Sequence, residues 1–365
     1  MRLTALVVLS LSTLTAPRVS WSQPHRTQRQ GCALTHTTLP LAEGDAVDSL
    51  TAPTVVFTAS GAVVVWRDRA GSLRVEGFDA AWRPLGAARE MARPAGAFAV
   101  APTPTGAVIA YVEHDHDVLL ARVNAHAEAQ NVPRRVAHED AAIEALSIVR
   151  TDAGFTVVWS ADNGRMLRGA ALDHRGVAHD RPSDLGEGRS PRLAWLPSMG
   201  TLALTVEGIT PESDASLIGL SPALQVNTRL RWPAATLGPV ELVGALHGVQ
   251  LHGGAATPSL VRVPPSGAAL GAASDGPARG RFTLLDLAVD GPSAFVLFDD
   301  VANARLVLAR TSPDGPIVTP ATVRTGAPVP ARLAVRDEGV AVVIRREPGA
   351  HGAARVVITQ ATCAQ

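Results

Sequence analysis

The chain has 365 residues, which is enough for one large domain or two domains of medium size. Hydrophobic residues make up 46% of it and charged residues 18%, and this globular composition excludes bulk disorder. The 33 basic residues are all arginine and balance 33 acidic residues, so no overall positive charge attracts nucleic acid, and a nucleic-acid partner is not expected.

Residues 1–22 are typical of a secretory signal peptide. Arg2 precedes an apolar run over residues 3–14, and Ser20-Trp21-Ser22 has the small-x-small pattern of a cleavage site. The run of about twelve residues is shorter than the roughly twenty that a membrane-spanning helix requires. We therefore expect a secreted or periplasmic monomer without a membrane span, in which residues 23–33 form a linker and residues 34–365 a single domain.

The two cysteines, Cys32 and Cys363, lie close to the two ends of the mature chain. In an oxidising compartment a lone pair of cysteines usually forms one disulfide, which would bring these ends together. A zinc ion would need more ligands than this pair supplies.

A short motif, glycine followed by an apolar β-rich run, recurs along the mature chain. It begins at Gly61, Gly106, Gly154, Gly200, Gly248, Gly291 and Gly339, at intervals of 43 to 48 residues. A second alternating run follows each copy after a polar loop, and a third run precedes most of the glycines. A more polar fourth segment, such as residues 83–86 or 132–136, closes the unit. The period of two predicts strands, four to each unit.

Seven units of four strands predict an all-β, seven-bladed β-propeller. Six or eight blades remain possible, because the fifth unit is degenerate. The innermost strands should be apolar on both faces, with Trp66, Tyr111 and Trp159 in the core. A pair of β-sandwiches or a solenoid is the alternative. The ends favour the propeller: the chain stops one strand short of a full unit, and residues 34–41 supply one orphan strand that can pair into the last blade beside the disulfide.

The motif at residues 61–66, followed by a Leu-x-x-x-x-x-Asp run at residues 73–79, resembles the generic repeat of secreted bacterial β-propellers. The resemblance is best at residues 54–90 and 141–186, is weakest at residues 237–280, and covers about 330 residues in all. It implies the fold and no functional subfamily, because propellers include hydrolases, lyases, receptors and scaffolds.

In a propeller, the loops between second and third strands open on one face, around the channel. There they should form an acidic ring that attracts a cation or a basic protein segment. The candidate ligand-binding residues are Asp68, Glu113, Asp115, Asp117, Asp162, Asp214 and Asp299, and Glu207, Glu212, Asp300 and Glu347 belong to the same ring. Arginines of these loops and of the segments joining the units largely cancel the charge. The alternative is that tight turns favour Asp for backbone hydrogen bonds, and the acidic excess has no function.

Residues 113–117, Glu-His-Asp-His-Asp, are the one local cluster of possible metal ligands. Alternation places only His114 and His116 on one side, which makes them weak candidates, and neither a metal nor another cofactor is predicted. The nucleophile motif Gly-x-Ser-x-Gly is absent, and His138-Glu139-Asp140 lacks the second His of His-Glu-x-x-His. No catalytic residue is assigned.

The sequence favours a binding or scaffold module that acts through its loop face on an extracellular ligand or protein. The alternatives are an extracellular hydrolase or lyase with its site at the channel mouth, and a purely structural surface protein. Trp82, Trp195 and Trp232 are candidates for sugar stacking, but structural packing is favoured for them, and aromatic residues make up only 4% of the chain.

Overall fold

Seven four-stranded antiparallel sheets are formed by the residues that the computed structural model describes. These residues are 32–39, 52–178, 180–210, 213–232, 241–245, 248–253, 259–263, 274–275, 282–290, 293–311, 318–325, 329–337, 339–348 and 354–363. They belong to one unit, Gly31–Gln365. The predicted signal peptide and residues 23–31 of the predicted linker lie outside them.

Each sheet is one blade, and its strands follow one another in chain order except in the last. Blade 1 consists of β2 Thr54–Thr58, β3 Gly61–Arg67, β4 Leu73–Asp79 and β5 Arg89–Ala92; blade 2 of β6 Ala95–Thr103, β7 Gly106–Glu113, β8 Asp117–Asn124 and β9 Arg134–His138. Blade 3 consists of β10 Ile143–Thr151, β11 Gly154–Ala161, β12 Met166–Leu172 and β13 Ser183–Gly186; blade 4 of β14 Arg189–Leu196, β15 Thr201–Glu207, β16 Ala215–Leu220 and β17 Val226–Trp232.

The remaining blades have the same order. Blade 5 consists of β18 Glu241–Ala245, β19 Gly248–Gly253, β20 Ser259–Val263 and β21 Ser274–Asp275; blade 6 of β22 Phe282–Asp290, β23 Ser293–Asp300, β24 Arg305–Thr311 and β25 Val318–Arg324. Blade 7 consists of β26 Ala331–Asp337, β27 Val340–Pro348, β28 Ala354–Cys363 and the N-terminal strand β1 Cys32–Thr38. Three short 3-10 helices, Asp162–Gly164, Pro197–Met199 and Val301–Asn303, lie between strands. None of the helices in the described part of the chain has the length and apolarity that a membrane-spanning helix requires.

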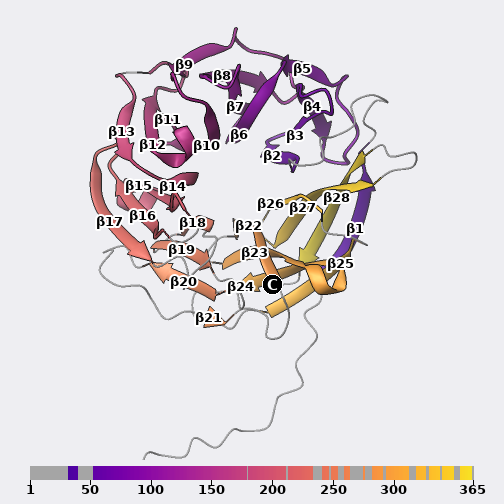
Figure 1. Ribbon diagram of the computed structural model, residues 1–365. Coiled ribbons are helices and arrows are strands. Elements are labelled where there is room, and N and C mark those ends of the chain that lie inside the picture. Colours follow the sequence, from indigo (N-terminus) through magenta and orange to yellow (C-terminus); the bar gives the residue numbers. More distant parts are fainter. Residues whose placement is uncertain are drawn as a thin grey trace, which may run out of the picture. The chain divides into compact units, whose positions relative to one another are not determined.

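The first strands of the blades form a closed ring. Neighbours in the series β2, β6, β10, β14, β18, β22 and β26 contact one another, and β26 also contacts β2 (Figure 1). The chain is therefore a seven-bladed β-propeller, as the sequence predicts, and the first strand of each blade is the innermost.

Where burial is described, the second strands are buried along most of their length, and the innermost strands are not. Every residue of β11 is buried, whereas β10, beside it and closer to the axis, alternates between buried and half-exposed positions. Where burial is described, the prediction for the innermost strands is therefore wrong: they border the axis, and the second strands are buried more completely. Trp66, Tyr111 and Trp159 lie on second strands and are at most 1% exposed, so their predicted place in the core is confirmed.

A five-residue turn recurs after the third strand of four blades. Its first residue accepts hydrogen bonds from amides further along the turn: Asp79 Oδ1 from Ala81 and Arg83, and Asp173 Oδ1 from Arg175 and Val177, for example. Asn124 and Ser221 start the other two turns. The Arg83 and Ala81 amides hold the pKa of Asp79 below its ordinary value. Because Arg83 is held in this turn, the fourth strand of blade 1 is Arg89–Ala92 and not residues 83–86.

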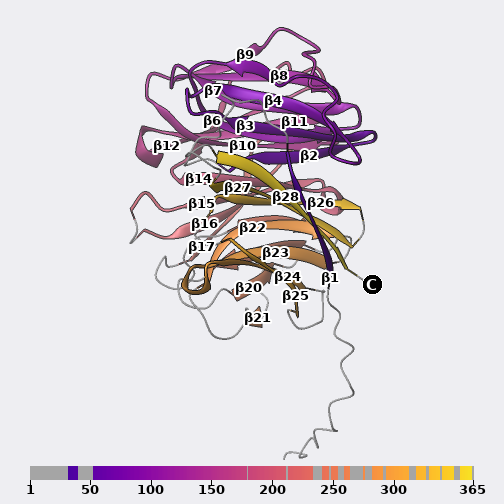
Figure 2. The same ribbon diagram turned by 90° about the vertical axis from the view of Figure 1, so that its right-hand side faces the viewer.

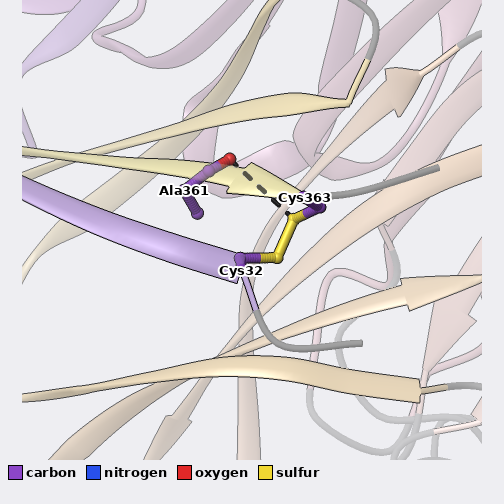
Figure 3. Close-up of a disulfide and its surroundings, with 3 residues drawn as sticks. All are labelled: Cys32, Ala361 and Cys363. Atoms are coloured by element: carbon purple, nitrogen blue, oxygen red, sulfur yellow. Dashed lines mark hydrogen bonds between the residues drawn. A yellow bond between two sulfur atoms is a disulfide. The ribbon is translucent and has the colours of Figure 1, made fainter. Parts of the chain in front are cut away.

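The N-terminal strand closes the ring, as the sequence predicts. β1 pairs with β28 over its whole length, from Cys32 opposite Cys363 to Thr38 opposite Val357 (Figure 2). The predicted Cys32–Cys363 disulfide is confirmed, with 4.2 Å between the two Cα atoms (Figure 3). β1 begins at Cys32, so the last two residues of the predicted linker belong to the blade.

A buried side-chain network also ties β1 to the rest of blade 7. Arg345, 3% exposed, donates to Glu347 Oε1 through Nε at 2.8 Å and Nη2 at 2.6 Å, and through Nη1 to Thr359 Oγ1. Thr359 Oγ1 lies 2.8 Å from Nδ1 of His36 on β1. The seam, by which we mean the junction of β1 with the rest of blade 7, thus combines backbone pairing, a disulfide and a charged network that spans three strands.

Replacing Cys363 with Ser is expected to lower the Tm without changing the strand content. The disulfide closes a loop of 331 residues. The chain-entropy model gives such a loop about 5 to 6 kcal/mol, an upper value because residual structure in the unfolded chain reduces it. Thermal unfolding followed by far-UV circular dichroism measures the effect. The double variant with Ser at both positions excludes an effect of the free thiol, and an unchanged Tm in both variants contradicts this role of the disulfide.

Candidate functional site

The propeller has two faces that differ in which connections they carry. The face with the loops between second and third strands and the connections from one blade to the next is called the loop face here. The opposite face, with the hairpins between first and second strands and the turns after the third strands, is called the hairpin face. The antiparallel pairing in every blade fixes this division.

Asp68 of the predicted acidic ring is a structural residue. It is 2% exposed, its Oδ1 accepts hydrogen bonds from the amides of Ala70 at 2.9 Å and Ser72 at 2.8 Å, and its Oδ2 accepts one from Arg74 Nε at 3.0 Å. Its carboxylate thus closes its own loop and leaves little for a ligand.

Asp299 and Asp300 are adjacent buried carboxylates at the end of β23, 5% and 0% exposed. Burial alone would raise the pKa of Asp300, but hydrogen bonds from Asn303 and Arg305 and the charge of Arg305 outweigh it and lower that pKa. Burial raises the pKa of Asp299, and the neighbouring Asp300 charge adds to the shift. Oδ1 of Asp299 has no hydrogen-bond partner. Asp300 stabilises the loop, whereas Asp299 is an uncompensated buried acid.

The Glu-His-Asp-His-Asp cluster of blade 2 is divided among separate contacts. Asp117 Oδ1 lies 3.0 Å from His138 Nδ1 and 3.5 Å from Arg135 Nη1. His116 Nδ1 lies 3.0 Å from the backbone oxygen of Glu139, and His114 Nδ1 lies 3.9 Å from Glu113 Oε2. Among the described residues, no group of three or more His, Cys, Asp or Glu side chains is arranged to hold a metal ion.

Four carboxylates of the acidic ring are paired with arginines of their own blades. Besides Asp68, Asp117 and Asp300, Glu347 is paired with Arg345 and Arg355. Asp115 and Asp162 lie in tight turns with positive φ, and Glu212 lies outside the described residues. Asp68 and Asp300 thus use their carboxylates to hold their own loops, which agrees with the tight-turn alternative for these two residues.

Two acids of the predicted ring, Glu207 and Asp214, border a polar depression of about 370 Å³ on the loop face between blades 3 and 4. The walls come from the β13–β14 connection, the β15–β16 loop and the outer strands of blade 4. The lining residues are Glu187, Gly188, Val206, Glu207, Gly208, Ile209, Ser213, Asp214, Ser216, Arg229 and Arg231. The volume is within the range of small-ligand sites.

The depression opens where blade 4 lacks a large aromatic side chain. Near the loop-face end of the second strand, Trp66, Tyr111 and Trp159 pack against the preceding blade in blades 1 to 3. In blade 4 the residue that packs against blade 3 at this end of β15 is Val206. Gly188 has a φ of +155°, and a Cβ there would lie 2.6 Å from the Val206 side chain, so only glycine lets the connection approach β15 so closely.

Some charged side chains in the depression are held and others are free. Glu207 accepts a hydrogen bond from Ser190 Oγ at 3.0 Å, and Arg229 Nη2 donates to the Leu185 oxygen at 2.7 Å. The side chains of Glu187, Asp214 and Arg231 are exposed and make no hydrogen bond or ion pair with any described residue. The depression thus presents charges of both signs on a fixed frame.

Glu187, Arg229 and Arg231 were not among the candidates from the sequence. The alternation of Arg229 and Arg231 identifies a strand, but no spacing relates it to Glu187 or Asp214. The three segments meet only because blade 4 packs against the end of blade 3.

No protein-family model matches the chain, and no curated protein sequence does. Solved structures do match. Hydrazine synthase of Kuenenia stuttgartiensis is 13% identical with a TM-score of 0.56, over 81% of this chain and 93% of that one. The Dos1 propeller is 7% identical with a TM-score of 0.55, over 82% and 75%. The β-propeller domain of Myceliophteria thermophila Cps50 (Swd1) is 11% identical with a TM-score of 0.52, over 86% and 97%.

These similarities support the propeller fold and no particular activity. Each of these structures is at most 13% identical to this chain. Function must therefore be argued from the residues of this chain.

Replacing Asp299 with Asn is expected to raise the Tm at pH 7. Because the folded-state pKa of Asp299 is raised above its ordinary value of 3.8, folding favours the protonated acid, and stability is lost as the pH rises through this interval. Asn mimics the neutral acid. The gain in Tm should therefore shrink towards zero as the pH falls and Asp299 of the wild type becomes protonated. Thermal unfolding at several pH values measures this difference in Tm between variant and wild type. The series runs from about pH 4, close to the ordinary pKa of Asp, to about pH 8.

Asp300→Asn is the matched control, because the lowered pKa of Asp300 gives the opposite sign. The charged form stabilises the fold above the ordinary value, so this variant should have a lower Tm at pH 7. Equal shifts of the same sign in both variants contradict this assignment of the two carboxylates.

Proposed function

We propose that this protein is exported, to the periplasm or the cell exterior, and binds an extracellular ligand or protein through its loop face. The observation that carries the proposal is the depression between blades 3 and 4, where the free carboxylates of Glu187 and Asp214 lie with the free guanidinium of Arg231. Charged groups without an internal partner on a rigid frame are available to a ligand with little reorganisation.

The ligand that suits this site best is a peptide segment carrying both acidic and basic side chains. A purely cationic ligand would be repelled by Arg229 and Arg231. A purely anionic ligand would be repelled by the carboxylates of Glu187, Glu207 and Asp214. The four ring acids that are already paired with arginines are one argument against a purely basic partner for the loop face. Charge pattern, and not net charge, would then decide which segment binds.

A hydrolase or lyase at the channel mouth is the alternative function. It requires convergent acid and base groups at the axis. Among the described residues, those with clearly shifted pKa values lie on second strands or at and after the ends of third strands: Asp79, Tyr111, Glu128, Asp299 and Asp300. This distribution supports binding over catalysis.

Arg231→Glu and Asp214→Arg are each expected to weaken peptide binding about tenfold or more, since a hydrogen bond to a charged group contributes about 1.5–3 kcal/mol. The probes are peptides selected from a random display library on the purified protein and measured again by calorimetry. The selected sequences should contain both acidic and basic residues.

Arg175→Glu, which reverses an exposed charge on the hairpin face, is the control and should leave the affinity unchanged. Selected peptides that bind all three variants as tightly as the wild type, or a library from which nothing binds saturably, would falsify the assignment of the depression.

Export is tested separately. When the full chain is produced in a Gram-negative host, the periplasmic fraction should contain a mature protein that begins at Gln23, after the predicted cleavage site. Intact-mass spectrometry identifies the start of the chain. A cytoplasmic protein that keeps residues 1–22 contradicts the proposal of export and leaves that of binding to be judged by the peptides.

A further inference from the structure

A second depression, of about 380 Å³, lies on the hairpin face between blades 3 and 4. Arg150, Thr151 and Asp152 line it from the β10–β11 hairpin, His174 from the turn after β12, and Trp195 from β14. Its volume is within the range of small-ligand sites. It is separated from the loop-face depression by the apolar layer between the two blades, which includes Leu167, Leu202 and Leu204.

Trp195 differs from the other tryptophans whose burial the structure describes. Trp66, Trp82 and Trp159 are at most 6% exposed, and Trp82 packs against Phe57 and Phe78, as the preference for structural packing predicts. Trp195 is half-buried: it packs against the apolar layer between blades 3 and 4 and also borders the depression. The layer holds the indole in place, while part of the side chain stays at the depression.

The indole N–H of Trp195 is shielded and has no hydrogen-bond partner. A buried donor without a partner costs about one to three kcal/mol, so hydrogen bonding does not explain the presence of tryptophan here. A smaller apolar residue could pack against the layer without that cost. The indole N–H of the buried Trp82 also has no partner, so what distinguishes Trp195 is that its half-buried side chain lines the depression.

The polar side chains around Trp195 are free. Arg150, Asp152 and His174 are exposed, and their side chains make no hydrogen bond or ion pair with any described residue. The backbone below them is fixed: the His174 oxygen accepts a hydrogen bond from Arg122 Nη1 at 2.7 Å, and Asp173 closes the turn. In the acidic ring, by contrast, several carboxylates are used to hold their own loops.

An indole that lines a depression together with a carboxylate, a guanidinium and an imidazole suits a sugar ring. The C–H groups of a pyranose carry a slight positive charge and pack on the negative face of an indole. Its hydroxyls both donate and accept, so Asp152 can accept from them while Arg150 donates. A quaternary cation would need a cage of several aromatic rings and would be repelled by Arg150. An anionic ligand would be repelled by Asp152.

We propose that the hairpin-face depression between blades 3 and 4 binds a neutral saccharide unit, which stacks on Trp195 and forms hydrogen bonds with Asp152 and Arg150. This site is independent of the loop-face site. Because the two depressions lie at opposite ends of the blade interface, one protein could hold a glycan on one face and a peptide segment on the other.

The probes are neutral oligosaccharides of glucose, mannose, galactose and N-acetylglucosamine, measured by calorimetry and by saturation-transfer NMR. At least one should bind saturably with a Kd of about 1 mM or tighter. Asp152→Asn should weaken this binding about fivefold to tenfold, since the amide cannot accept as the carboxylate does. Trp195→Ala should abolish it.

Because Trp195→Ala also removes packing, Trp195→Phe is the second variant. It keeps an aromatic face and should retain part of the affinity, with a Tm close to that of the wild type. Arg231→Glu, on the loop face, should leave saccharide binding unchanged, so that failure of either site can be recognised separately. The proposal is overturned if no neutral saccharide of the series binds saturably, or if Asp152→Asn and Trp195→Ala bind as the wild type does.

Discussion

The closure of the ring is the constraint on which the rest of the structure depends. A second strand such as β11 is buried on both faces, so every blade needs a neighbour on each side, and blade 7 can supply one to blade 1 only when it is itself complete. Its fourth strand comes from the other end of the chain. β1 is held there by backbone pairing, by the Cys32–Cys363 disulfide and by the network from Arg345 to His36. Unfolding of this seam would expose apolar faces of two blades at once.

The tight turns of the blades explain why the acidic residues are poor guides to function. A blade turns its chain three times within 43 to 48 residues, and each tight turn leaves amides that need acceptors. Asp68 and Asp79 satisfy such amides at opposite ends of blade 1. A residue type that is frequent because turns require it cannot also mark a binding site by its frequency. The informative carboxylates are those that make no hydrogen bond or ion pair with any described residue, such as Asp214 and Asp152.

The sequence predicts local features well because their causes are local. The alternation and the glycines locate all seven second strands of the structure, because the period of a strand is visible in the sequence. The orphan strand and the two cysteines predict the closure of the ring, because both lie near the chain ends. The fourth strand of blade 1 was misplaced because hydrogen bonds of Asp79 hold residues 79–83 in a turn. The candidate sites could not be foreseen as sites. Each joins segments of two blades through packing, and packing leaves no fixed spacing between Asp152 and Trp195 or between Glu187 and Arg231.

Both depressions lie in one interface, between blades 3 and 4, and its packing explains this. At the loop-face end Val206 stands near the position where preceding blades have Trp or Tyr, and the missing volume becomes a depression. At the hairpin-face end the large aromatic ring is present, but on the innermost strand β14 and not on β15, so it reaches the surface. The apolar layer in between stays closed. The interface is therefore open at the loop face beside Val206 and at the hairpin face beside Trp195, while the apolar layer between these ends keeps the blades joined.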